Sequence, residues 1–151
     1  MSGDSVDDKI AHICSCIGPE DAYGCWPWLG SANGGNRGNF HLNGKNSATH
    51  AVYRLFVGDV SDHLWMLHSC HRGDKGCVNP DHMSPGTAPE NAQQRILQGR
   101  GTNQKLWPKD IYAMRKKFAE GITNEVIAEE FNVSVSTVQG IRIKRRWGWL
   151  K

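Results

Sequence analysis

The chain has 151 residues, a mass of 16.8 kDa, a hydrophobic content of 38% and a mean hydropathy of −0.54. This length fits one ordinary domain, or a small domain joined to a short module, and excludes a large multidomain enzyme. The net charge of +3 is uneven: residues 1–100 hold 8 Lys and Arg against 10 Asp and Glu, whereas residues 101–151 hold 10 against 5. The basic C-terminal third favours contact with a polyanion, although a solvated basic tail explains the same charges.

No stretch approaches the roughly 18 apolar residues that a membrane-spanning helix needs. The first twenty residues carry four acids and lack the apolar run of a secretory signal. We therefore expect a cytoplasmic protein without a membrane partner. Five cysteines make an odd number, so metal or redox chemistry is a better expectation than a disulfide framework.

In chain order, residues 5–17 predict a weak helix. The dipeptide Asn43-Gly44 suits a two-residue turn and predicts a β-hairpin over about 37–49. Apolar spacing then predicts a short helix over 50–57. A strand over 64–68 leads into a loop rich in Gly, Asp and Pro over 69–87, and a helix capped by Thr87 follows over 88–97.

The loop carries three soft or borderline metal ligands, Cys70, Cys77 and His82, with the spacing C-x6-C-x4-H. Zinc takes four ligands in a tetrahedron, from thiolate sulfur and imidazole nitrogen. Cys25 is the candidate for the fourth position, because it begins an aromatic segment that can pack on the loop, whereas Cys14 and Cys16 lie in the weak N-terminal helix. His68 and His71 compete as ligands on spacing alone.

These residues resemble the HNH, or ββα-metal, nucleases, and most closely the homing endonucleases that share a zinc-bound loop with the His-Cys box enzymes. The resemblance covers roughly residues 23–98. The matching residues are Cys25-Trp26-x-Trp28, Gly38-x-Phe40, His68-x-Cys70, Cys77-Val78-Asn79-Pro80-Asp81-His82, Gly86-Thr87 and Glu90-Asn91.

The resemblance implies that His68 is the general base and that Asn79 is the structural residue that holds the loop. It implies that Asn91 is a ligand of a catalytic divalent cation, Mg²⁺ or similar. It also implies that Cys25, Cys70, Cys77 and His82 bind a structural Zn²⁺. Two features depart from the family pattern: the spacer between Cys70 and Cys77 is long, and Leu67 stands where some branches have an acidic second metal ligand.

Residues 107–147 predict three helices, over 108–120, 123–131 and 134–145, with a tight turn near Asn132. This pattern is similar to a helix-turn-helix of the homeodomain-like or resolvase type, although a protein-binding helical module has the same apolar spacing. In a DNA complex the last helix would lie in the major groove. Its candidate base contacts are Ser136, Thr137, Gln139 and Arg142, and its candidate phosphate contacts are Lys144, Arg145 and Arg146. Arg37, Lys45 and Arg95 are further candidate DNA contacts in the nuclease part.

The expected fold is therefore α+β: a zinc-stapled ββα-metal nuclease domain with a β-hairpin over 1–100 (core 23–98), a linker over 101–106, and an all-α helix-turn-helix module over 107–151. We expect a site-specific, homing-type DNA endonuclease of a bacterial or phage-infected host cell, acting on double-stranded DNA as a monomer or homodimer. Two alternatives stay open. One is a non-catalytic zinc and helix-turn-helix DNA-binding regulator, and the other is an HNH restriction endonuclease.

Overall fold

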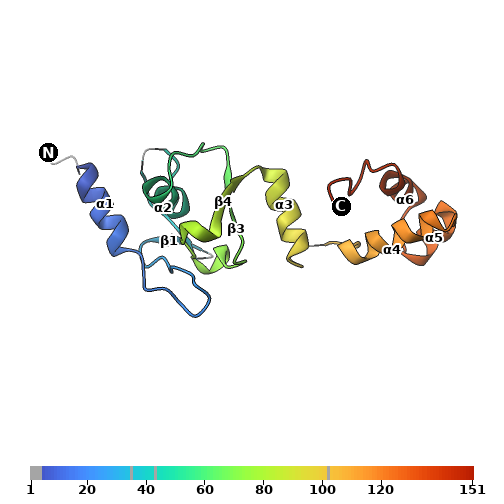
Figure 1. Cartoon of the computed structure of the whole chain (residues 1–151), viewed down its shortest axis with the longest axis horizontal. Coiled ribbons are helices and arrows are strands. Elements are labelled where there is room, and N and C mark those ends of the chain that lie inside the picture. Colours follow the sequence, from blue (N-terminus) through green and yellow to red (C-terminus); the bar gives the residue numbers. More distant parts are fainter. Residues whose placement is uncertain (1–4, 35, 43, 102) are drawn as a thin grey trace. The chain divides into compact units, whose positions relative to one another are not determined.

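The structure is a computed structural model that describes residues 5–34, 36–42, 44–101 and 103–151. The chain divides into two compact units, Met1–Gln94 (unit 1) and Arg95–Lys151 (unit 2). The described residues form six α-helices and two small two-stranded sheets, which is the mixed α and β composition that the sequence predicts (Figure 1). None of the described helices is long and apolar enough to cross a membrane.

Unit 1 mixes short helices with short strands. In chain order these are α1 (Val6–Ser15), β1 (Ala32–Asn33), β2 (Arg37–Gly38), α2 (Ala48–Phe56), β3 (Trp65–His68), the 3-10 turns Gly73–Lys75 and Pro80–His82, β4 (Met83–Gly86) and α3 (Ala88–Leu97). The boundary between the units falls inside α3, earlier than the 101–106 linker that the sequence suggests.

The antiparallel pair of β3 and β4 is the larger ladder of unit 1, with Trp65 opposite Gly86 and His68 opposite Met83. The predicted strand over 64–68 and the predicted helix over 88–97 are both present. Strand β4 lies within the stretch that we predicted to be a loop, because Pro85 and Gly86 give it the composition of a turn. The order is thus strand, ligand-bearing loop, strand and helix.

The predicted hairpin over 37–49 is confirmed in part. The strand ladder lies earlier, between β1 and β2, but His41 and Asn46 form an antiparallel bridge across the predicted turn, and the Ser47 N–H donates to the Phe40 carbonyl at 2.9 Å. Leu42 of this segment is buried in the core, and α2 begins at Ala48. Asn43 of the predicted turn lies outside the described residues.

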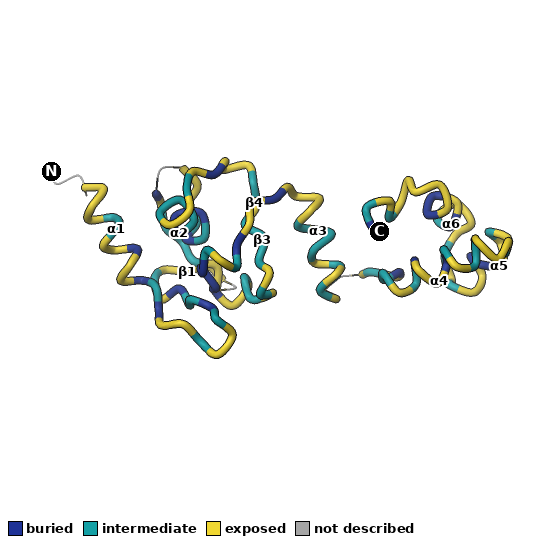
Figure 2. Tube along the Cα trace, viewed as in Figure 1, coloured by how far each residue is buried: buried dark blue, intermediate teal, exposed yellow. Residues whose placement is uncertain are grey.

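The core of unit 1 is small, as its loop-rich sequence suggests. It gathers residues from α1, α2 and the connecting loops, and Trp28 lies against Gly38, where an added Cβ atom would come within 2.5 Å of the indole. The buried members are Ile13, Cys16, Trp28, Leu42, Ala48, Ala51, Val52, Val78 and Met83. Figure 2 shows that much of the rest of unit 1 is exposed or only partly buried.

Unit 2 consists of α4 (Pro108–Ala119), α5 (Asn124–Glu130) and α6 (Val135–Arg142). The predicted tight turn is present, since Asn132 has a φ of 51° between α5 and α6. Their shared core contains Leu106, Ile111, Met114, Ile127, Ala128, Val138, Ile141 and Leu150.

Helix α6 ends three residues before the predicted end. Lys144 has a φ of 59°, and the Arg146 N–H returns to the Gly140 carbonyl at 2.9 Å, so the chain reverses after the helix. The C-terminal segment then packs on α4, where Tyr112 donates to the Lys151 carbonyl and Arg115 to that of Trp147.

A candidate metal centre and its surroundings

Three thiols and one imidazole meet in unit 1: Cys25, Cys70, Cys77 and His82, the four residues that the sequence singled out. Their ligand atoms all lie within 4.8 Å of one another. The Sγ atoms of Cys25 and Cys77 are each 3.7 Å from His82 Nδ1. Tetrahedral zinc, with bonds of about 2.3 Å to sulfur and 2.0 Å to nitrogen, would place these atoms about 3.6 Å apart. The Cys3His cluster could therefore hold a metal such as zinc.

The site is assembled by pairing between two segments that are far apart in the sequence. Pro27 and Cys77 form an isolated antiparallel bridge. Val78 N–H donates to the Trp26 carbonyl at 2.9 Å, and Trp28 N–H donates to the Gly76 carbonyl at 2.9 Å. This short ladder brings Cys25 to the loop that follows β3.

Asn79 fastens the same two segments together with its side chain. Its Nδ2 donates to the Gly24 carbonyl at 2.6 Å, and its Oδ1 accepts from Asp81 N–H at 3.0 Å. The residue is only 5% exposed. On the other segment, Asp21 Oδ1 accepts from the Cys25 N–H at 2.9 Å. Both loops are therefore held by side-chain hydrogen bonds next to the ligands.

Burial favours the neutral form of two thiols in the cluster. Burial raises the pKa of the Cys25 thiol to about 12, and the nearby sulfurs of Cys77 and Cys70 act in the same direction. Burial also raises the pKa of the Cys77 thiol. Thiolates crowded in a buried site repel one another, so a dication is the natural stabiliser of their charged form.

His68, the last residue of β3, is tied to this centre through the backbone. Its Nε2–H donates to the Cys77 carbonyl at 3.0 Å. Burial lowers the pKa of His68, the interactions of its ring with the Cys77 and Met66 backbones oppose this effect, and the charges of His82 and Arg37 add to it. Gly73 lies against the ring, since an added Cβ atom there would be 2.6 Å from Nδ1.

The other predicted residues of the nuclease part lie on different elements. Asn91 and Arg95 are on α3, where Asn91 is partly buried and Arg95 is exposed. Arg37 is exposed on β2. The Lys45 ammonium lies 5.5 Å from the centre of the Trp65 ring. Helix α3 begins with Thr87 and Glu90 bonded to each other, so Asn91 follows a well-defined helix start.

The predicted DNA-contact residues of unit 2 gather on α6 and just after it. Ser136, Gln139 and Arg142 are exposed on the helix, and Thr137 is partly buried. Lys144, Arg145 and Arg146 are exposed beyond its end. Gly140 is buried beneath Arg146, so its lack of a side chain serves packing within the unit.

Sequence reasoning missed how far Arg142 is engaged within the unit. Its guanidinium lies 4.4 Å from the centre of the Phe118 ring and donates to the Ile122 carbonyl and to Asn124. Asn124 in turn donates to Gln139. A polar residue at a helix start is an ordinary cap signal, so nothing in the sequence marked Asn124 for this role.

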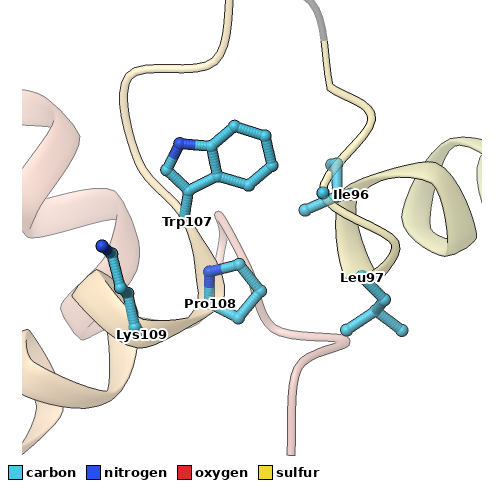
Figure 3. A pocket seen from close by; sticks show the side chains of 6 residues that line it. Ile96, Leu97, Trp107, Pro108 and Lys109 are labelled. Atoms are coloured by element: carbon cyan, nitrogen blue, oxygen red, sulfur yellow. The ribbon is translucent and has the colours of Figure 1, made fainter.

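An open hollow in unit 2 is mainly apolar. It is lined by Ile96, Leu97, Gly99, Trp107, Pro108 and Lys109 (Figure 3). Lys109 is the one titratable side chain in this lining. The hollow therefore lacks the convergent polar groups that hydrolytic chemistry requires, and the Cys3His centre with His68 remains the candidate site.

The similarity to known proteins extends over both units. The chain is 30% identical over 129 residues to protein 2.8 of Escherichia phage T7, which covers 85% of this chain and 88% of the relative. The chain belongs to the family of phage T7 protein 2.8. Protein 7.7 of the same phage is 26% identical over 129 residues, covering 82% of this chain and 95% of the relative. No protein-family model matches the chain, and no solved structure does.

The alignment with protein 2.8 is longer than either unit alone, so both units are shared with that relative at least in part. The names of proteins 2.8 and 7.7 state no activity. The function of this member of the protein 2.8 family is therefore argued from its own residues.

Proposed function

We propose that the chain is a site-specific DNA endonuclease of the HNH, or ββα-metal, class. Unit 1 would hydrolyse the phosphodiester bond and unit 2 would select the site. The observation that carries this proposal is the position of His68, which ends β3 beside a loop held by the Cys3His cluster and is fixed by the carbonyl of one cluster residue. Membership of a phage protein family supports a homing-type role.

In this proposal His68 is the general base. A carbonyl oxygen only accepts hydrogen bonds, so the bond to Cys77 requires the proton of the neutral imidazole to be on Nε2. Nδ1 is then the basic nitrogen, able to take a proton from the attacking water. Because Cys77 is also a proposed zinc ligand, the zinc-bound loop would set the orientation of the base, as supporting groups commonly do in metal sites.

Asn91 is the proposed ligand of a divalent cation at the reaction centre. Its amide oxygen is a hard donor of the kind that Mg²⁺ accepts, and Mg²⁺ usually keeps several waters and substrate oxygens around it. Such an ion supplies charge stabilisation to the leaving 3′ oxygen when it is bound. The short connection from β4 to α3 holds Asn91 on a helix that begins directly after the second strand.

Arg37 is the proposed phosphate contact of unit 1. Arg37 is exposed on β2, and its charge lowers the pKa of His68. The chain leading into β2 touches the loop that holds the imidazole, since an added Cβ atom at Gly76 would lie 3.2 Å from the Asn36 carbonyl. An exposed guanidinium beside a general base can bind the phosphate that the base must reach.

Unit 2 is the proposed source of DNA affinity. Unit 1 holds 6 Lys and Arg against 10 Asp and Glu, whereas unit 2 holds 12 against 5. Binding to the phosphate backbone needs positive charge and weakens steeply as salt rises. The acidic nuclease unit would therefore reach DNA because it is joined to the basic unit. With one His68 per chain, a monomer would cut one strand and a homodimer both.

The proposal is tested by incubating the zinc-loaded full chain with supercoiled plasmid that carries a library of host and phage DNA, with and without Mg²⁺. We expect nicked or linear plasmid only when Mg²⁺ is present, with 5′-phosphate and 3′-hydroxyl ends. Variants His68→Ala and Asn91→Ala should lose the activity, and His63→Ala, at an exposed histidine in the turn before β3, is the matched control.

The main alternative is a DNA-binding regulator in which unit 1 is only a zinc module. It predicts that the protein binds a subset of the library fragments and cuts none of them. The variant His68→Ala should bind the same fragments. An HNH restriction enzyme shares the proposed chemistry and would cut a short symmetric site as a dimer.

A further inference from the structure

A chain of polar contacts on unit 2 joins the outer face of α6 to the start of α5. Arg142 Nη2 donates to the Ile122 carbonyl at 2.9 Å, and Arg142 Nε donates to Asn124 Oδ1 at 2.8 Å. Asn124 Nδ2 then donates to Gln139 Oε1 at 2.7 Å. The Arg142 guanidinium also lies over the Phe118 ring, and this contact holds Arg142 in place at the start of the series of hydrogen bonds.

The chemistry of Arg142 fixes the donor and the acceptor in each of these side-chain hydrogen bonds. A guanidinium has five N–H donors and no acceptor, so the Asn124 oxygen must face Arg142. The Asn124 nitrogen must then face Gln139, and the Gln139 oxygen must face Asn124. Amide orientations are usually a choice between two similar atoms, but here the arginine determines both of them.

The side-chain amide of Gln139 is consequently held in one orientation. Its oxygen is turned toward Asn124 and accepts a hydrogen bond, and its nitrogen carries two N–H donors. The residue is exposed on α6, whereas its neighbours Val138 and Gly140 are buried. A preset donor on the exposed face of a helix is suited to a partner that offers acceptors.

We propose that Arg142 and Asn124 preset Gln139 as a hydrogen-bond donor, and that Gln139 selects guanine at one position of the DNA target. This inference rests on the proposed function, in which α6 lies in the major groove. Guanine presents two acceptors there, O6 and N7, whereas thymine presents one acceptor, O4, beside its methyl group, adenine combines one acceptor with one donor, and cytosine presents the N4 donor. The usual glutamine contact with adenine also uses the glutamine oxygen, and here that oxygen faces Asn124.

Arg142 and Asn124 are positioning residues in this account. Arg142 donates hydrogen bonds to Asn124 of α5 and to the Ile122 carbonyl in the loop before α5. Its role therefore differs from the direct base contact that the sequence suggests. Removing either residue should change which base is chosen at the Gln139 position, because the amide of Gln139 could then turn over. Loss of a phosphate contact would instead weaken binding to all sequences evenly.

The test is a selection of bound duplexes from a randomised library, using the full chain with His68→Ala so that nothing is cut. The parent protein should enrich guanine at one position, by about tenfold over the other bases. Gln139→Ala should lose the preference at that position alone. In Asn124→Asp the new carboxylate keeps its bond to Arg142 but can only accept, so Gln139 must turn its nitrogen inward and present its oxygen. The preference should then move to cytosine or adenine, which offer donors.

Arg145→Ala is the matched control, because this exposed residue follows α6 and should lower affinity for every duplex without changing base preference. Thermal unfolding of each variant checks that unit 2 is folded. If the parent selects a sequence and Gln139→Ala selects the same one, the inference is wrong while the proposed function stands. An Asn124→Asp profile that keeps guanine would also overturn it. A folded parent that selects no duplex would refute both the inference and the DNA-binding part of the proposed function.

Discussion

Replacing one ligand of the Cys3His cluster should unfold unit 1 at a much lower temperature and leave unit 2 intact. Cys77→Ser is the sharpest change, because Cys77 is 2% exposed and its sulfur is 3.7 Å from His82 Nδ1. Structural zinc contributes about 10–16 kcal/mol in small zinc-dependent domains. Shared over four ligands, this is about 2.5–4 kcal/mol each, or about 70- to 900-fold in zinc affinity.

For a unit of this size, a loss of about 2.5–4 kcal/mol lowers the unfolding midpoint by about 10–30 °C. Differential scanning calorimetry, together with metal analysis of the purified protein, measures both effects. Cys14→Ser is the matched control, because Cys14 is exposed on α1 and lies outside the cluster. A Cys77→Ser protein that holds one zinc per chain and unfolds at the temperature of Cys14→Ser would refute the assignment of the cluster.

Three further predictions concern other parts of the molecule. Burial lowers the pKa of His50 below 6.5, so the contribution of the neutral imidazole to stability is complete above pH 6.5 and is lost as the pH falls through the lowered pKa. Chemical denaturation from pH 7.5 to 5 should therefore show that wild type loses more stability than His50→Gln. Equal losses would contradict this. Gly73→Ala places a methyl group against the His68 ring and should slow DNA cleavage about 10- to 100-fold at unchanged zinc content, whereas Gly34→Ala, with open space around it, should cut normally. Ile127→Ala should destabilise unit 2 by about 2–5 kcal/mol, measured by urea unfolding, and a cost below about 1 kcal/mol would show that the residue is not a core member.

The elements that were predictable from the sequence are those with a local signal. Thr87 followed by Glu90 marks the start of α3, and the apolar spacing of α4 and α5 marks two helices whose observed ends lie close to the predicted ones. The four cluster residues were also predictable, because thiol and imidazole side chains in a loop-rich segment have few other uses.

The remaining features depend on contacts between distant residues. Strand β4 contains Pro85 and Gly86, and only its pairing with β3 makes it a strand. The ladder between β1 and β2 likewise exists only through the pairing of two short strands with each other. The engagement of Arg142 by Phe118 and Asn124 likewise requires the packed unit, where residues far apart in sequence come together.

The proposed role of His68 as the base of a DNA-cleaving centre is tested most directly by single-turnover cleavage of a mapped target site by wild type, His68→Ala and His63→Ala. The three proteins are first matched for zinc content and for affinity to the uncut site. We expect His63→Ala to cut at the rate of wild type in Mg²⁺ and His68→Ala to be slower by at least about 100-fold. Equal rates for His68→Ala and wild type would contradict the assignment of His68 as the base.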